Sequence, residues 1–120
     1  MMNIEWFREY CLSLKGVTEE FPFGEATLVF KVMGKMFALT NIDLFTSINL
    51  KCDPEWAVEL REQNIAIHPG YHMNKRHWNT VMIDGTLADD FIKELIDHSY
   101  DLVVSGLTKK IRAEWENLTS

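Results

Sequence analysis

The chain has 120 residues and a mass of 14.0 kDa, the size of a single domain with one hydrophobic core, and we expect one domain over residues 1–120. With 47% hydrophobic and 25% charged residues, its composition is that of a globular protein and excludes intrinsic disorder. Twelve Lys and Arg against eighteen Asp and Glu give a net charge of −6, which argues against a protein that coats nucleic acid or anionic membranes with its whole surface.

From the sequence we expect neither membrane insertion nor export. Its apolar runs are of four residues or fewer, whereas a membrane-spanning helix needs about 20 apolar residues. It begins Met-Met-Asn-Ile-Glu-Trp, with an acid where a signal peptide carries basic residues. We therefore expect a cytoplasmic protein that does not associate with membranes. Cys11 and Cys52 form neither a zinc motif nor a disulfide framework, and we expect both to be reduced thiols, with Cys11 in the core.

The first predicted element is a helix over residues 3–15. It begins at Asn3, a favoured N-cap, and ends at Gly16, and an apolar stripe repeats along it at helical spacing. The following stretch, residues 17–24, shows no period and contains proline and glycine, so we expect a loop. Its two phenylalanines are expected to attach this loop to the core.

Strand patterns follow. Alternation of apolar and polar residues predicts strands over 27–33, 36–40 and 45–50, the first two joined by a two-residue turn at Gly34 and Lys35. A helix over 53–63 is then indicated by an Asx cap, a proline at the first helical position and an acid in the first turn.

The second half predicts two further strands and two helices. Strands are expected over 65–68 and 77–83, separated by a Pro-Gly break and a loop over 71–76. The longest helix opens at Thr86 or Leu87 and is stopped by Gly106. A final amphipathic helix places four apolar residues on one face: Leu107, Ile111, Trp115 and Leu118.

These elements define the expected fold class. Hairpins connect most neighbouring strands, and no strand-helix-strand unit of the parallel type is present. We therefore expect an α+β two-layer sandwich, with an antiparallel β-sheet and helices packed on one face, in the order α-β-β-β-α-β-β-α-α.

Residues 65–83 differ in charge from the rest of the chain. They contain no Asp or Glu and carry +2 from Lys75 and Arg76, while the other 101 residues carry −8 from ten bases and eighteen acids. The segment also holds three of the four histidines, Tyr71 and Trp78. Cations, aromatic rings and an amide, Asn74, are what phosphate contact and base stacking require. The alternative is that the aromatic residues pack in the core or at its rim and that the cations lie on a solvated turn.

Neither a metal site nor a catalytic motif is indicated. His68, His72 and His77 are separated by a Pro-Gly break that prevents helical convergence, and no Cys, Asp or Glu within the segment supplies a further ligand. No serine or cysteine lies in a nucleophile-elbow context, and the glycines are scattered singly rather than gathered in a phosphate-binding loop. We expect a protein that is not an enzyme and needs no metal or cofactor.

Several short motifs occur in the order and spacing of a known family. They include Phe-Pro-Phe-Gly at 21–24, Leu-Val-Phe-Lys-Val at 28–32, Gly-Lys-Met-Phe-Ala at 34–38, Leu-Lys-Cys-Asp-Pro at 50–54, Leu-Arg at 60–61 and Ser-Tyr-Asp-Leu-Val at 99–103. The most specific is Pro-Gly-Tyr-His-Met-Asn-Lys at 69–75, followed by His-Trp at 77–78. With these motifs the chain resembles the MmcQ/YjbR family of small bacterial cytoplasmic proteins, from the first helix to about Trp115.

The resemblance implies a CyaY-like or secretion-chaperone-like sandwich and a DNA-binding role through a double-wing arrangement of strands and loops. It brings no catalytic residue. Our leading hypothesis is therefore a non-enzymatic DNA-binding protein whose candidate contact residues are Lys51, Tyr71, His72, Asn74, Lys75, Arg76, His77 and Trp78.

Each class of candidate residue has an expected role. Lys51, Lys75 and Arg76 would contact phosphates, and Asn74 and His72 would add hydrogen bonds. Tyr71 or Trp78 would stack on bases or support the loop. The alternative hypothesis is an interaction module in which the sheet or an acidic helix face receives a protein partner or a second copy, or the loop shapes a small-ligand pocket.

Overall fold

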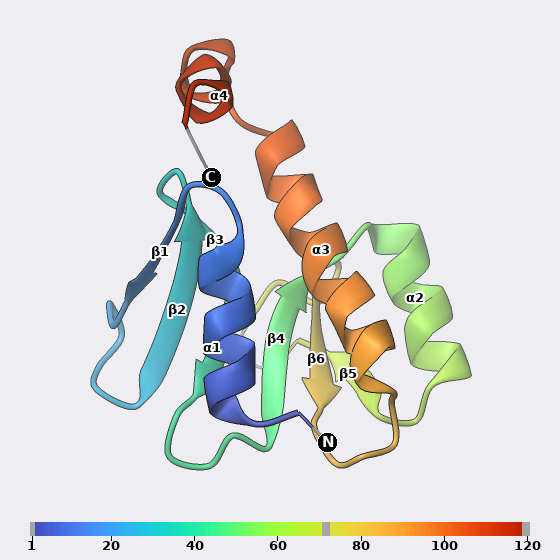
Figure 1. Ribbon diagram of the computed structural model, residues 1–120. Helices are drawn as coiled ribbons and strands as arrows, with labels where there is room; N and C mark the ends of the chain where they lie inside the picture. The colour runs from blue at the N-terminus through green and yellow to red at the C-terminus, as the bar shows by residue number, and fades with distance from the viewer. Residues whose placement is uncertain (1, 71–72, 119–120) are drawn as a thin grey trace.

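The computed structural model describes residues 2–70 and 73–118 and shows a six-stranded antiparallel sheet with four helices (Figure 1). The strand order is β1-β2-β3-β4-β6-β5. The α+β class and the predicted order are confirmed, and the structure adds one strand, β1. In chain order the elements are α1 (Ile4–Ser13), β1 (Val17–Glu20), β2 (Thr27–Val32), β3 (Lys35–Asn41), β4 (Ser47–Lys51), α2 (Pro54–Gln63), β5 (Ile67–Pro69), β6 (Trp78–Met82), α3 (Asp89–Ser105) and α4 (Lys109–Glu116).

The main core lies between the sheet and helices α1 and α3, which cover one of its faces (Figure 1). Its largest fully buried side chains include Phe7, Phe30, Phe37 and Ile96. Cys11 is in this core as predicted, and burial raises the pKa of its thiol far above the usual range, which makes it unreactive. In the part of the chain that the structure describes, no helix has the length and hydropathy needed to cross a bilayer.

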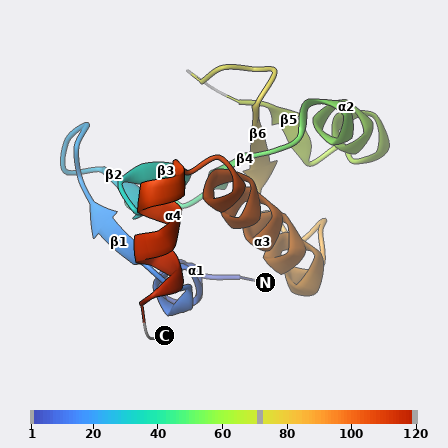
Figure 2. The same ribbon diagram turned by 90° about the horizontal axis from the view of Figure 1, so that it is seen from above.

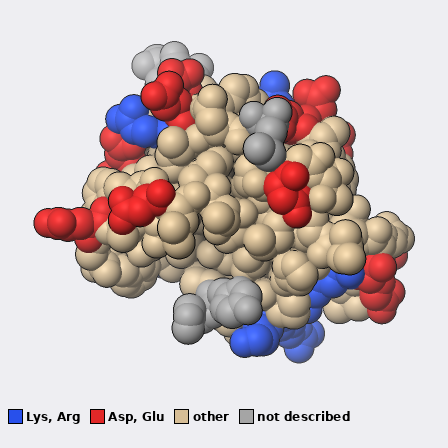
Figure 3. Space-filling model, turned by 90° about the horizontal axis from the view of Figure 1, so that it is seen from below, with Lys and Arg blue, Asp and Glu red and all other residues tan. Residues whose placement is uncertain are grey.

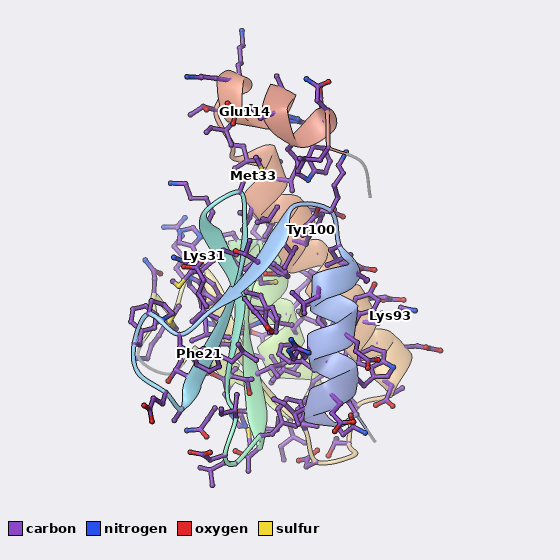
Figure 4. All side chains as sticks on the ribbon, turned by 60° about the vertical axis from the view of Figure 1, so that its left-hand side comes forward. Phe21, Lys31, Met33, Lys93, Tyr100 and Glu114 are labelled. Atoms are coloured by element: carbon purple, nitrogen blue, oxygen red, sulfur yellow. The ribbon has the colours of Figure 1, made fainter. Side chains whose placement is uncertain are left out.

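The prediction of a loop over residues 17–24 is wrong for its first half. Residues 17–20 form β1, an edge strand that pairs with β2 from Val17↔Val32 to Glu20↔Val29. The strand lacks an apolar alternation because it is an edge strand and its acids pair with cations, Glu19 with Arg8 at 2.6 Å and Glu20 with Lys31 at 3.4 Å. Figure 4 shows Lys31 on the side of the sheet away from α1.

The two phenylalanines that follow β1 do not attach the segment to the core. Phe21 is 48% exposed and Phe23 is 63% exposed, so this prediction is also wrong. Pro22 and Gly24 instead turn the chain at the end of the sheet, where the carbonyl of Phe21 accepts a hydrogen bond from Gly24 N–H at 3.5 Å.

The β2–β3 hairpin turns at Met33 and Gly34, one residue earlier than predicted. Both residues have positive φ, 50° and 84°, as a two-residue turn of type I′ requires. Lys35 is thereby the first residue of β3 rather than part of the turn. Figure 4 shows Met33 at this end of the hairpin, on the side where α4 lies.

Local side chains set the starts of the helices. Asn3 caps α1 and Asp53 caps α2, each accepting the N–H of the residue three positions later. The long helix α3 starts at Asp89, later than the predicted Thr86 or Leu87. Asp84 Oδ1 accepts the N–H of Thr86 at 2.9 Å, and this hydrogen bond forms a turn where the helix was expected to begin.

Candidate functional site

Strand order brings cations together at one end of the sheet. Because β3, β4 and β6 are neighbours and antiparallel, the start of β3, the end of β4 and the start of β6 lie at the same end. This end therefore carries Lys35, Lys51 and the β5–β6 connection, which contains Lys75 and Arg76. A groove of about 370 Å³ is lined by Lys35, Lys51, Trp78 and the last turn of α3, which confirms that these elements adjoin.

The end of α3 also lies here, and α4, with Lys109 and Lys110 in its first turn, follows it (Figure 1). Trp115 holds α4 in place, because its Nε1 donates a hydrogen bond to Tyr100 Oη at 2.9 Å and Lys15 Nζ lies 4.1 Å from its ring centre. We call this set the cationic end: Lys35, Lys51, Lys75, Arg76, Lys109 and Lys110.

The opposite end of the sheet is acidic. Its connections, residues 21–26, 42–46, 64–66 and 83–88, contain no Lys or Arg. They and the start of α3 hold a set of acids that we call the acidic end: Glu25, Asp43, Asp84, Asp89 and Asp90. Figure 3 looks at this end and shows Asp and Glu side chains projecting on its left, Lys and Arg side chains at its lower right, and a broad surface without charge between them. The net charge of −6 therefore conceals an uneven distribution of charge between the two ends of the sheet.

Within the β5–β6 connection, Asn74 builds the turn that presents the cations. Its Oδ1 accepts the N–H of Arg76 at 2.9 Å, and its carbonyl accepts the N–H groups of His77 and Trp78. The Asn74 amide oxygen therefore takes part in the hydrogen bonding of the turn itself. Lys75 and Arg76 are exposed at its tip.

Arg61, which lies in α2 and not in the turn itself, anchors this turn with its side chain. Its guanidinium donates hydrogen bonds to Asn79 Oδ1 at 2.7 Å, to the Trp78 carbonyl at 3.3 Å and to the Lys75 carbonyl. The sequence hypothesis did not include Arg61 among the site residues. The only available signal was its place in the Leu-Arg motif at 60–61, since two of its three acceptors are backbone carbonyls that any sequence would supply.

Trp78, the first residue of β6, supports the turn by packing against the sheet. It is only 8% exposed and packs with Val29 and Leu39 in a second cluster, on the sheet face away from α1 and α3. Figure 2 shows the β5–β6 connection on that same side. A Cβ at Gly70 would lie 2.8 Å from Trp78 Cβ, so only glycine fits there. Of the two roles expected for this tryptophan, the geometry fits support rather than stacking. Two other candidates, Tyr71 and His72, lie outside the described residues.

The corner where β4 meets α2 is held to α3 by two polar side chains. The buried Ser99 Oγ accepts the N–H of Lys51 at 2.9 Å and donates to the carbonyl of Phe37 at 2.5 Å. His98 Nε2 accepts the N–H of Asp53 at 3.1 Å. Lys51 is half-buried at this corner, and the carbonyl of the half-buried His77 accepts the N–H of Cys52 next to it.

His98 predicts a pH dependence of stability. Burial lowers its pKa below 6.5, an effect that outweighs the nearby carboxylates of Asp53 and Asp101. The folded state therefore holds the neutral ring, whose contribution to stability is complete above pH 6.5 and is lost as the pH falls below it. Urea unfolding from about pH 7.5 to about pH 5 should show a loss of stability that is smaller in His98→Gln. Identical profiles would contradict this assignment.

Two open grooves flank the turn that carries the cations. Lys75 lines one of about 520 Å³ with His68, Pro69 and Met82, and Arg76 lines another of about 410 Å³ with residues of α2. The two cations thus face different sides of a projecting turn, as contacts to separate phosphates would require.

The interior near this site leaves little room for a ligand. A cavity between Leu50, Asn79, Leu95 and His98 measures about 10 Å³, enough for about one water. Burial raises the pKa of the adjoining Cys52 thiol to about 11, so it stays protonated at neutral pH. Over residues 2–70 and 73–118, no group of three or more His, Cys, Asp and Glu side chains is placed to hold a metal ion.

A six-stranded antiparallel sheet with helices on one face defines the chain as a small α+β sandwich, and several cations gather at one end of its sheet. The chain belongs to the YjbR family, whose model matches residues 12–102. That match includes Arg61 and the whole β5–β6 connection.

Relatives of known sequence and structure agree with this assignment. The uncharacterized protein YbdF of Escherichia coli O157:H7 is 37% identical over 107 residues, which cover 88% of each chain. The uncharacterized protein YjbR of Escherichia coli K12 is 33% identical over 112 residues, which cover 92% of this chain and 95% of YjbR. The crystal structure of DR2400 from Deinococcus radiodurans matches with a TM-score of 0.90 and 42% identity, over 97% of this chain and 89% of that one. A Pseudomonas syringae crystal structure matches with a TM-score of 0.72 and 31% identity, over 84% and 98%.

Proposed function

We propose that the protein binds double-stranded DNA through its cationic end. The observation that carries this proposal is the separation of charge: the projecting turn with Lys75 and Arg76 lies at the end that also holds Lys35 and Lys51, while the connections at the other end lack cations. A phosphate backbone is attracted to the first end and repelled by the second. DNA would therefore approach the molecule from one side only, despite the net charge of −6.

The geometry favours contact with phosphates over the reading of bases. Lys75 and Arg76 are exposed and free to reach a strand, whereas the Asn74 side chain is engaged in its own turn and Trp78 is buried beneath it. Phosphate contacts set position and affinity but carry no sequence information. We therefore expect binding that depends strongly on salt and weakly on sequence.

Titration of a fluorescently labelled duplex at low salt, followed by anisotropy, tests the proposal. Replacing Lys75 and Arg76 together by Gln should weaken binding by about tenfold or more, because two phosphate contacts are lost. The matched control replaces Arg8 and Lys93 by Gln, which removes the same charge from α1 and α3. It should change affinity much less, because these residues lie outside the cationic end.

Three results would overturn the proposal. The wild-type protein could fail to bind the duplex at low salt, the Lys75 and Arg76 variant could bind as tightly as wild type, or both double variants could be weakened equally. The last result would mean that only overall charge matters and that no site exists at the cationic end.

A further inference from the structure

Exposed apolar side chains gather at the acidic end. Phe21 is 48% exposed, Phe23 is 63% exposed and Leu44 is 70% exposed. They lie on the β1–β2 turn and the β3–β4 turn. These turns are neighbours because Thr27 of β2 pairs with Asn41 of β3 at this end of the sheet, and the N–H of Ile42 donates to the Ala26 carbonyl at 2.9 Å. Figure 1 shows both turns side by side at the lower left of the molecule.

The β3–β4 turn is ordered by its own hydrogen bonds. In the β3–β4 turn, Asn41 Oδ1 accepts the N–H groups of Asp43 and Leu44, both at 3.0 Å, and its carbonyl accepts the N–H of Phe45 at 2.9 Å. Phe45 has a φ of 41°, a left-handed conformation that is uncommon outside glycine. The backbone therefore holds Leu44 out to solvent rather than allowing it to fold back onto the core.

The charges beside these side chains are negative. Glu25 and Asp43 are exposed on the same two turns, and neither turn contains Lys or Arg. The nearest cation along the adjoining strands, Lys31, is already engaged with Glu20 at 3.4 Å. An apolar surface bordered by acids excludes DNA and attracts a segment that combines basic and apolar residues.

We infer that the turns 21–26 and 41–45 form a docking surface for a partner protein that presents a basic segment with apolar side chains. Charge complementarity selects this occupant. A second copy docked through the same acidic surface would bring like charges together, which is unfavourable. The surface lies at the end opposite to the proposed DNA site, so it stands whether or not that site binds DNA.

A defined probe tests this surface: a synthetic peptide of alternating Lys and Leu, titrated into isotope-labelled protein and followed by amide chemical shifts. Shifts are expected at residues 21–26 and 41–45. Replacing Phe23 and Leu44 together by Ser should weaken binding at least about tenfold, because exposed apolar anchors dominate such contacts. Ile65→Ser is the matched control, since Ile65 is 86% exposed in the α2–β5 connection, at the opposite edge of the sheet.

Further measurements distinguish this docking surface from other modes of binding. The Lys75 and Arg76 double variant should bind the peptide like wild type, so failure of the DNA proposal leaves this test intact. A peptide of alternating Glu and Leu should not bind. Shifts located elsewhere, equal binding of the two peptides, or equal binding by the Phe23 and Leu44 variant would overturn the inference. So would sedimentation showing a dimer that is lost in this variant, because the occupant would then be a second copy.

Discussion

Replacing Arg61 by Met is expected to lower the free energy of unfolding by about 2–4 kcal/mol, one of the two largest effects predicted for a single side chain at this site. The substitution keeps most of the aliphatic volume but removes the donors to Asn79 Oδ1 and to the carbonyls of Lys75 and Trp78. Asn79 is buried, so its oxygen would be left without a partner. Urea denaturation measures the loss, and amide exchange in residues 73–78 should become faster.

The control for this prediction is Arg112→Met. Arg112 is exposed on α4 and forms an i, i+4 pair with Glu116 at 3.7 Å, which contributes no more than about 0.5 kcal/mol. Arg61→Met should also weaken DNA binding, because the turn that carries Lys75 and Arg76 loses its anchor. A loss of stability no larger than that of Arg112→Met would mean that Arg61 does not hold the turn.

Replacing Ser99 by Ala is expected to cost about 2–4 kcal/mol, because one hydroxyl satisfies two backbone groups in the interior. The change leaves the Lys51 N–H and the Phe37 carbonyl without their partner. Ser105→Ala is the matched control on the same helix, since the exposed Ser105 only bonds the carbonyl of Leu102 within its own helix. That change should stay within about 0.5 kcal/mol. Equal losses in the two variants would show that Ser99 does not hold Lys51.

Local signals in the sequence were sufficient for most of the elements. The caps Asn3 and Asp53 placed the starts of two helices, and Gly106 placed the end of α3, because each acts through bonds within a few residues. The edge strand β1 was missed because its pairing with β2 and its ion pairs with Arg8 and Lys31 come from residues distant along the chain.

The candidate site was predicted in part. The absence of acids in residues 65–83 pointed to Lys75 and Arg76, which the structure places exposed at the tip of a turn. The anchoring roles of Arg61 and Ser99 were not predicted, because both bind backbone groups that leave no trace in the sequence. The grouping of these cations with Lys35 and Lys51 follows from the β4–β6 pairing and could not be read from charge counts along the chain.

The structure also narrows the alternative hypotheses. The interior cavity beside Asn79 holds about one water, and the grooves beside Lys75 and Arg76 are open, so the geometry gives little support to a buried small-ligand pocket. The exposed Phe23 and Leu44 favour a protein partner at the acidic end instead. Nucleic acid and protein partner would then occupy opposite ends of one small domain.

The salt dependence of duplex binding tests the proposed DNA site most directly. A plot of log Kd against log salt concentration, measured for wild type and for the Lys75 and Arg76 double Gln variant, counts the phosphate contacts that each protein makes. We predict that the slope of the variant is smaller by up to about two units, since each lost phosphate contact removes about 0.9. Equal slopes for the two proteins, or no binding by wild type at low salt, would contradict the assignment of DNA binding to the cationic end.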